Sequence, residues 1–341
     1  RDPKLSYSRT ELFAVSVAGG PVVNLTDRNP AFVGDVTDLD WASDGDLIIQ
    51  GTVGCYTHLY RFAAATGEIT RLTPEGEVVF GGLSLTPDRR QVAFTRETGS
   101  SVPEVMLLDL TSGEITALTD LNPWLQTEID WGSQRVITWE NEGLSIEGIL
   151  TLPPSYKEEE RLPLLVYVHG GPHSRTPDAL RQYFSFQALA AQGYAVLAPN
   201  YRGGTGRGHD FAIANRCDLG GGDFRDIMAG VDHVIAAGVA DPDRLGILGG
   251  SYGGYMTNWA IGQTDRFKAA VTMRSCVNEA SMVGTSDFGF VDMANYPSVP
   301  WEDMSFYKRF SPITHVAKIN TPLLIEHQEE DLRCPMEQAE Q

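Results

Sequence analysis

The sequence predicts two domains of different architecture. Residues 1–143 are expected to form the C-terminal part of a β-propeller, and residues 144–341 an α/β domain with a mostly parallel sheet covered on both faces. Three observations support this division: an internal repeat in the first domain, alternating strand-like and helix-like segments in the second, and a serine flanked by glycines at a predicted strand–helix turn. At about 150 residues per domain, the 341 residues suffice for two domains.

A motif occurs three times in the first domain. It reads LFAVSVAGGPVVNLT at 12–26, LYRFAAATGEITRLT at 59–73 and VMLLDLTSGEITALT at 105–119. Each copy predicts a strand, a glycine-containing turn and a second strand, and each ends in Leu-Thr. A period of about 45 residues with four short strands is typical of a propeller blade, so we expect about 2.5 blades. A plain antiparallel sandwich is the alternative, and the fixed period favours the propeller.

In the second domain, continuous apolar runs alternate with helix-like stretches. The expected strands are 164–168, 194–198, 245–248, 269–273 and 323–325, and the expected helices are 178–192, 223–237 and 252–263. Continuous apolar runs are typical of strands buried on both faces, and strand–helix alternation is typical of a parallel sheet. The change of pattern places the domain boundary near residues 144–154.

The segment 244–256 contains the pattern Gly-x-Ser-x-Gly, in which Ser251 lies between Gly249 and Gly253. In a nucleophile elbow a strand turns so tightly into a helix that side chains beside the serine would clash, and glycines remove that clash. A helix N-terminus also favours the negative charge that develops there during acyl transfer. Ser251 is therefore the candidate nucleophile of an α/β-hydrolase domain. The alternative is a glycine-rich turn without a catalytic role.

The segment His-Gly-Gly-Pro-His at 169–173 directly follows a predicted strand. Glycines in this loop let backbone N–H groups approach a ligand oxygen, and in α/β-hydrolases they form the oxyanion hole with the N–H that follows the nucleophile. We expect the donors to be the amides of Tyr252 and Gly171, with Gly170 as the alternative to Gly171. The two histidines cannot share a helix across Gly-Gly-Pro, so we expect no metal site.

Asp331 is the candidate acid because it lies just beyond the predicted strand 323–325. The chain order in this fold is serine, acid, histidine, and no histidine follows Asp331 in this sequence. The seven histidines are His58, His169, His173, His209, His233, His315 and His327. We therefore expect the chain to be an internal segment of a longer protein, truncated before its catalytic histidine.

The composition excludes several kinds of partner. With 26 Lys and Arg against 45 Asp and Glu, the formal charge is −19, which would repel nucleic acid and anionic membrane surfaces. No apolar run reaches the roughly 18 residues of a membrane span, and residues 1–10 lack a signal-peptide core. We expect a cytoplasmic protein with reduced cysteines. The cysteines are Cys55, Cys217, Cys276 and Cys334.

Several motifs together resemble the prolyl oligopeptidase family of serine peptidases. They are GGSYGGYM at 249–256, HGGPH at 169–173, NYRGGTGRG at 200–208, DPDRLGI at 241–247 and EEDLRCP at 329–335. The SDFGF segment at 286–290 and the PWED segment at 300–303 resemble the acylaminoacyl-peptidase branch. The resemblance implies a seven-bladed propeller, of which about 2.5 blades lie in this chain. It also implies short peptide substrates admitted through the propeller, self-assembly into homo-oligomers and a histidine beyond Asp331.

The reaction implied by the resemblance is acyl transfer without a cofactor. Ser251 attacks the scissile carbonyl, a histidine outside this sequence takes the proton, and Asp331 orients that histidine. The pocket for the substrate side chain is expected to involve side chains that could equally be ordinary core residues. These candidates are His169, Phe288, Phe290 and Trp301.

Two other functions remain open at this point. The same triad hydrolyses esters, so the second hypothesis is a carboxylesterase, although a propeller filter favours peptides over small esters. The third is a catalytically inactive propeller scaffold, which the missing histidine favours and the intact elbow opposes. The sequence does not show which end of a peptide is recognised.

Overall fold

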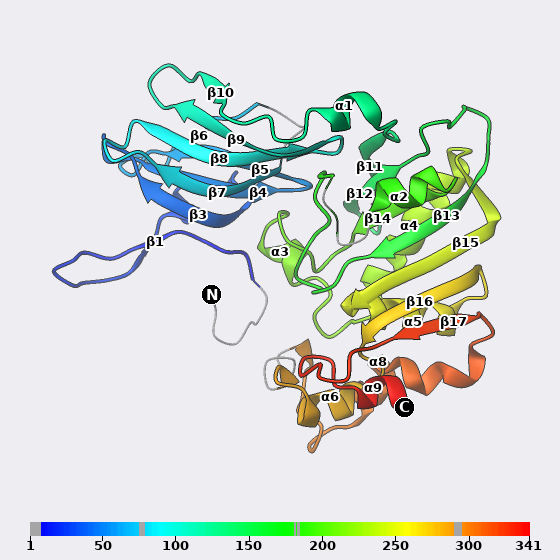
Figure 1. Cartoon of the computed structure of the whole chain (residues 1–341). Coiled ribbons are helices and arrows are strands. Elements are labelled where there is room, and N and C mark those ends of the chain that lie inside the picture. Colours follow the sequence, from blue (N-terminus) through cyan, green and yellow to red (C-terminus); the bar gives the residue numbers. More distant parts are fainter. Residues whose placement is uncertain (1–7, 75–78, 181, 183–184, 290–294) are drawn as a thin grey trace.

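The computed structural model describes residues 8–74, 79–180, 182, 185–289 and 295–341. Within them the strands form one two-stranded sheet, two four-stranded sheets and one seven-stranded sheet (Figure 1). The first three sheets lie in the N-terminal half of the chain, and the seven-stranded sheet lies in the C-terminal half. The coarse division into an all-β half and an α/β half is as expected.

The two four-stranded sheets are antiparallel meanders. The two-stranded sheet consists of β1 (Phe13–Ala14) and β2 (Val23–Asn24). The first four-stranded sheet consists of β3 (Asp35–Trp41), β4 (Leu47–Val53), β5 (Tyr56–Phe62) and β6 (Ile69–Arg71). The second four-stranded sheet consists of β7 (Val79–Leu85), β8 (Gln91–Thr98), β9 (Ser101–Asp109) and β10 (Ile115–Ala117). Each copy of the repeated motif forms an antiparallel hairpin, as its turn and strand pattern predicted.

The structure explains why each copy ends in Leu-Thr. In every copy the threonine hydroxyl accepts a hydrogen bond from the backbone N–H of the first residue, and the preceding leucine N–H donates to the carbonyl of that first residue. The threonine bonds are Leu12 N to Thr26 at 2.7 Å, Leu59 N to Thr73 at 3.3 Å and Val105 N to Thr119 at 2.8 Å. The leucine bonds, from Leu25, Leu72 and Leu118, are all 2.8 Å long. The motif therefore closes the open end of each hairpin.

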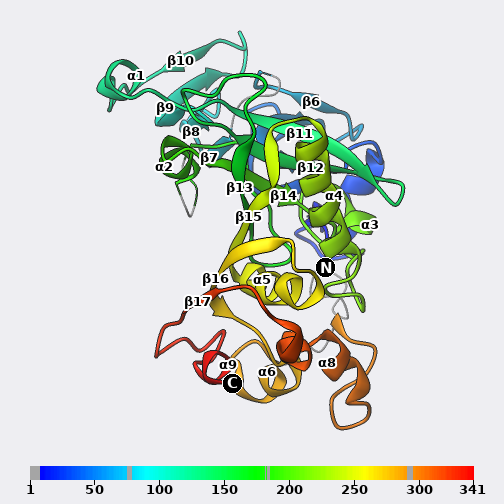
Figure 2. The same ribbon diagram turned by 90° about the vertical axis from the view of Figure 1, so that its right-hand side faces the viewer.

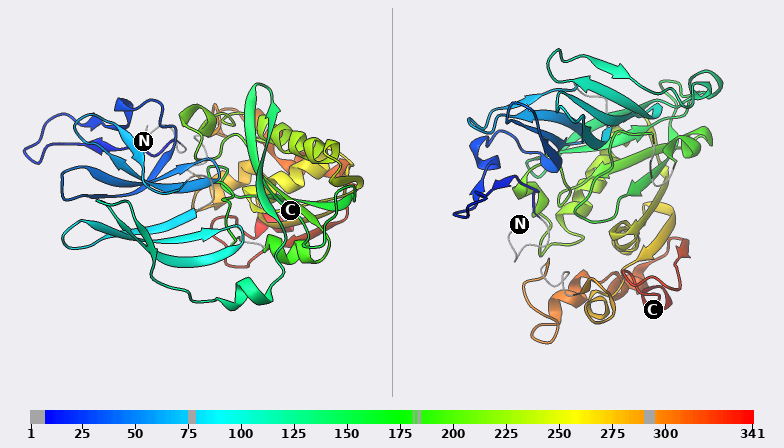
Figure 3. Two further views of the ribbon diagram at one scale, coloured as in Figure 1. Left: turned by 90° about the horizontal axis from the view of Figure 1, so that it is seen from above. Right: turned by 60° about the vertical axis from the view of Figure 1, so that its left-hand side comes forward.

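Apolar side chains join the two four-stranded sheets. Leu59 of β5 packs in one buried cluster with Val92 and Phe94 of β8 and with Met106 and Leu108 of β9. The two sheets lie side by side in the view from above (Figure 3, left). A shared apolar seam of this kind lets neighbouring sheets bury faces that would be exposed in isolation.

The seven-stranded sheet has the order β11-β12-β14-β13-β15-β16-β17 and is parallel from β14 to β17. Its strands are β11 (Gln134–Asn141), β12 (Leu144–Thr151), β13 (Leu162–Val168), β14 (Ala195–Asn200), β15 (Ala240–Ser251), β16 (Phe267–Ser275) and β17 (Leu323–Glu326). The five predicted strands are confirmed. The sheet begins at Gln134, before residue 144, because β11 pairs along its whole length with β12.

Alternate residues of β13 enter two different apolar clusters. Leu164, Val166 and Val168 pack into the cluster that holds residues of α4 (Gly222–Ala236) and α5 (Tyr252–Gln263), whereas Tyr167 packs with Phe186 of α2 (Phe186–Ala191). Figure 2 shows α4 and α5 beside the sheet. Among the described residues, the other α-helices are α1 (Trp124–Glu128), α3 (His209–Ala212), α6 (Glu279–Thr285), α8 (Ser305–Phe310) and α9 (Glu337–Glu340), and the 3-10 helices are η1 (Thr26–Arg28) and η3 (Pro312–Lys318).

Two of the three predicted helices match α4 and α5, and the third is shorter than expected. A helix was predicted over 178–192, but α2 begins only after Ser185, whose hydroxyl accepts from the Ala188 N–H as an N-cap. Upstream, the N–H of Asp178 donates to the Cys55 carbonyl and that of Leu180 to the Thr98 carbonyl. Tertiary hydrogen bonds to the N-terminal half thus replace the helical pattern there.

The loop after β14 fastens the two halves together. The Gly206 N–H donates to the Asp35 carboxylate at 2.6 Å, and the Gly206 carbonyl accepts from the Gly54 N–H at 2.9 Å. Gly206 has φ +83, and a Cβ there would lie 2.9 Å from the Gly54 nitrogen. Nearby, half-buried Arg175 donates to the Cys55 carbonyl at 2.9 Å. These contacts fix the loops of β3 to β5 against the sheet that carries Ser251.

No helix among the described residues combines the length and apolar composition needed to cross a membrane.

Candidate active site

Ser251 ends β15 and immediately precedes α5, at the turn where the sequence predicted an elbow. Its φ of 59° and ψ of −124° lie in the left-handed region that most side chains avoid. Such backbone strain generally costs about 1–3 kcal/mol and persists only where the surroundings enforce it. The fold therefore holds this serine in an unfavourable conformation at the carboxyl edge of a parallel sheet.

The glycines beside Ser251 are required by backbone packing. A Cβ on Gly249 would lie 2.6 Å from both the Val168 and the Gly253 carbonyl oxygens. A Cβ on Gly253 would overlap the Val168 carbonyl oxygen itself. The glycines of the Gly-x-Ser-x-Gly pattern thus avoid two clashes. One is with the backbone of β13 at Val168, and the other is between Gly249 and Gly253 across the turn.

The loop after β13 lies against the serine. A Cβ on Gly170 would meet the Ser251 Cβ at 3.3 Å, and Gly171, with φ +127, lines the same cavities as Ser251. Tyr252 is the first residue of α5, where backbone N–H groups have no intrahelical acceptor. Tyr252 and the loop at 170–171 therefore both lie next to the candidate nucleophile.

His169, which directly precedes the two glycines of this loop, is buried and contacts the first of them. Its ring stacks on Tyr201 at 4.3 Å, and its Nδ1 lies 2.8 Å from the Gly170 carbonyl oxygen. Burial lowers the pKa of His169 to about 4, so the ring is neutral at pH 7. His169 lines a second cavity, of about 390 Å³, which it shares with Gly170 and Ser251.

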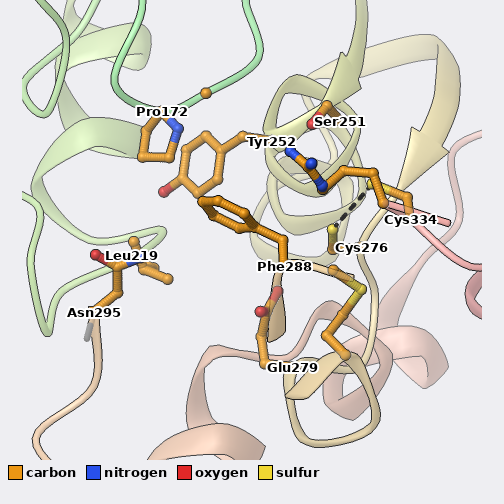
Figure 4. A pocket seen from close by; sticks show the side chains of 12 residues that line it. Pro172, Leu219, Ser251, Tyr252, Cys276, Glu279, Phe288, Asn295 and Cys334 are labelled. Carbon is orange, nitrogen blue, oxygen red and sulfur yellow. Dashed lines mark hydrogen bonds between the residues drawn. The ribbon is translucent and has the colours of Figure 1, made fainter. Parts of the chain in front are cut away.

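A cavity of about 260 Å³ opens beside Ser251 (Figure 4). Its walls come from segments far apart in the chain: Tyr252 of α5, Glu279 of α6, Phe288 after α6, and Cys334 after β17. The volume is several times the roughly 30 Å³ that a water molecule occupies in the liquid. The space next to the serine is therefore large enough for a substrate side chain.

Asp331 lies in the loop that follows β17. Its Oδ1 accepts the N–H groups of Arg333 and Cys334, each at 2.9 Å. Arg333 in turn donates to Asp287 at 2.6 Å and lies over the Phe288 ring, 4.6 Å from its centroid. Arg333 and Cys334 both line the cavity beside Ser251, so the acid loop borders the same space as the nucleophile.

The structure brings some of the expected pocket residues together and not others. Phe288 lines the cavity with Ser251. Trp301 is 72% exposed and is not part of this lining, which corrects its expected place in the pocket: it lies on a surface turn. His169 faces the second cavity rather than this one. Phe290 lies outside the described residues.

Sequence reasoning missed a buried pair beneath the elbow. The Tyr252 hydroxyl donates to the Asp223 carboxylate at 2.5 Å, and Asp223 is fully buried at the start of α4. Burial raises the pKa of Asp223 to about 7 against the opposing effect of the Tyr252 hydrogen bond. In the sequence, Asp223 directly follows three glycines at the start of a predicted helix, which could have marked it as a candidate site residue. Nothing in that pattern indicates that Tyr252 is its hydrogen-bond partner.

None of the four cysteines, all of which lie among the described residues, forms a disulfide. Cys276, just after β16, and Cys334 lie with their sulfurs 3.6 Å apart in the cavity wall (Figure 4). Within the part of the chain that the structure describes, no cluster of three His, Cys, Asp or Glu side chains could hold a metal ion.

Residues 181–341, which contain Ser251 and Asp331, match the model of the prolyl oligopeptidase family. These residues belong to that family. The resemblance seen in the sequence motifs is confirmed, and the domain is that of a serine-type peptidase, a hydrolase.

Related proteins carry peptidase names. An uncharacterized peptidase of Bacillus subtilis, YuxL, is 36% identical over 97% of this chain and 50% of its own length. The acylamino-acid-releasing enzyme of Arabidopsis thaliana is 38% identical over 56% of this chain and 26% of its own.

Solved structures of acylaminoacyl peptidases are also similar to this chain. An acylaminoacyl peptidase of Pyrococcus horikoshii superposes with a TM-score of 0.83 at 29% identity, covering 94% of this chain and 49% of that one. An acylaminoacyl peptidase in complex with Z-Gly-Gly-Phe-chloromethyl ketone also gives 0.83 at 29% identity, covering 94% and 50%. The chain thus spans about half the length of these peptidases.

Proposed function

We propose that the whole protein hydrolyses short peptides, in the manner of an acylaminoacyl peptidase, through an acyl-enzyme on Ser251. The observation that carries the proposal is the strained serine at the head of α5, beside glycine amides and open to a cavity of about 260 Å³. This arrangement presents a nucleophile and oxyanion donors to one bound carbonyl.

In this mechanism the Ser251 hydroxyl attacks the scissile carbonyl carbon. The Tyr252 amide and the Gly171 amide, or that of Gly170, donate to the carbonyl oxygen as it becomes negative. The amine leaves with a proton, and water releases the acyl group from Ser251. In the whole protein, a histidine outside the sequence described above acts as the base, with Asp331 as its orienting acid.

Peptides are the proposed substrates for two reasons. The family and the relatives are peptidases, and one similar acylaminoacyl peptidase was solved with a peptide chloromethyl ketone. In addition, we propose that the two four-stranded sheets are propeller blades, with about 2.5 blades in this chain, and that the propeller restricts access to short peptides. The contacts of Asp35, Gly54 and Cys55 with the loops of the α/β half support this arrangement.

The substrate class is tested by comparing an acetyl-amino-acid p-nitroanilide and an acetylated peptide with a p-nitrophenyl ester, using the whole protein. We expect turnover of the amide and peptide substrates, because the oxyanion donors stabilise the tetrahedral state of the harder amide reaction. Ester turnover without any amide or peptide turnover would show a carboxylesterase instead. No turnover of either class would support an inactive scaffold.

Replacing Asp331 by Asn in the whole protein is expected to lower kcat about 10⁴-fold, as loss of the triad carboxylate does in other serine peptidases. The Asn oxygen can still accept the Arg333 and Cys334 N–H groups, so the loop should keep its shape. Steady-state kinetics measure the effect. The control is Glu329→Gln, an exposed carboxylate on the same loop, which should keep full activity. Equal losses in both variants would remove Asp331 from its proposed role.

A further inference from the structure

The cavity beside Ser251 holds a buried carboxylate that the proposed mechanism does not use. Glu279, at the start of α6, is only 5% exposed and belongs to the cavity lining. Its Oε2 accepts a hydrogen bond from the Tyr296 hydroxyl at 2.7 Å. In Figure 4 the carboxylate points from α6 toward Phe288 and the space below Tyr252. An occupant of the cavity therefore meets this carboxylate.

The rest of the lining is mixed, because the buried amide of Asn295 lies there together with apolar side chains. Leu219, Met282 and Phe288 contribute its hydrocarbon surface. Hydrocarbon surface and a carboxylate in one wall suit a side chain with a methylene stem and a cationic end, since the stem is buried and the charge is paired. A purely apolar side chain would cover the carboxylate without offering it a cation.

The other charged residue of the lining does not offset Glu279. The Arg333 guanidinium is already paired with Asp287 at 2.6 Å, and its side chain is 56% exposed, so it lies at the rim. Glu279 is far more buried. Among the described residues that line the pocket, Glu279 is therefore the acidic side chain that a substrate cation can meet.

We propose that Glu279 makes this peptidase prefer lysine or arginine as the residue whose carbonyl Ser251 attacks. The inference rests on the proposed peptidase function. It extends that function by assigning a specificity-determining residue and a substrate class. The ammonium or guanidinium of the substrate binds the Glu279 carboxylate, and the stem packs against Phe288 and Met282.

The test uses the whole protein and compares the p-nitroanilides of lysine, norleucine and glutamate, each acetylated on its α-amino group. Norleucine has a straight apolar stem like that of lysine but no ammonium. We expect kcat/KM for lysine to exceed that for norleucine by about 10- to 100-fold, the range that hydrogen bonds to charged groups contribute. In Glu279→Gln, which keeps the shape and an acceptor for Tyr296, the ratio should fall to about one. Glu302→Gln, an exposed carboxylate outside the cavity lining, should keep the wild-type ratio.

Several results would overturn the inference. They are a wild-type enzyme that prefers norleucine or glutamate, or an unchanged ratio in a folded Glu279→Gln variant. The wild-type ratio alone decides the matter if that variant does not fold. Similar kcat/KM values for the lysine, norleucine and glutamate substrates would overturn the inference but not the proposed peptidase function. No turnover of any substrate, with no reaction of Ser251 toward a fluorophosphonate, overturns the proposed function and the inference together.

Discussion

Replacing Ser251 by alanine in the whole protein is expected to lower kcat for peptide hydrolysis about 10⁶-fold, as removal of the nucleophile does in serine peptidases. The residual rate would come from the oxyanion donors and substrate binding. The substitution removes only one oxygen, and within the described residues the Ser251 hydroxyl makes no hydrogen bond whose loss would affect folding. Alanine in a left-handed conformation keeps the same backbone cost as serine, so the unfolding temperature should change little.

Steady-state kinetics and thermal unfolding together measure this prediction. The control is Ser100→Ala, an exposed serine at the β8–β9 turn, which should keep full activity. Substantial peptide turnover by a folded Ser251→Ala variant would show that another group is the nucleophile.

Replacing Gly253 by alanine is expected to be the most damaging single change to the elbow apart from loss of the serine itself. The added Cβ would overlap the Val168 carbonyl oxygen, and two backbone segments cannot separate without moving β13 or α5. Forcing extra atoms into a packed site costs about 1–3 kcal/mol, occasionally more. Displacing Ser251 by about 1 Å would lower kcat by about 100-fold.

Chemical denaturation and kinetics of the Gly253→Ala variant test both effects. Gly284→Ala is the matched control, because a Cβ there meets nothing within 4 Å and the residue lies inside α6. Alanine in a helix interior is more favourable than glycine by up to about 1 kcal/mol, so this variant should be as stable as the parent or more so. A Gly253→Ala variant with unchanged stability and kcat would contradict the tight elbow.

The elbow and the parallel strands could be predicted because their signals are local. Gly249 and Gly253 are diagnostic since the clash they avoid depends on a few neighbouring backbone atoms. The hairpins of the repeat were predictable for the same reason, and the structure adds the cause: the terminal threonine closes each hairpin on its own first residue.

The pocket could not be predicted in the same way because its walls come from separate segments. Glu279 belongs to no motif of the sequence, and only the packing of α6 makes it 5% exposed in the cavity beside the serine. Trp301, which was expected in the pocket because of the family resemblance, is 72% exposed.

Tertiary contacts also decided two local features. Cys276 and Cys334 approach to 3.6 Å only because β16 and the acid loop end at the same edge of the sheet. The predicted helix at 178–192 was shortened by hydrogen bonds from Asp178 and Leu180 to the N-terminal half. Neither partner can be read from the local sequence.

The central claim, that Ser251 is an activated nucleophile, is tested most directly by treating the whole protein with a fluorophosphonate and mapping the adduct by peptide mass spectrometry. The claim predicts a single stoichiometric adduct on Ser251 that is absent from Ser251→Ala and strongly slowed in Asp331→Asn. Peptide hydrolysis by a protein that forms no adduct, or that forms it on a different residue, would contradict the claim.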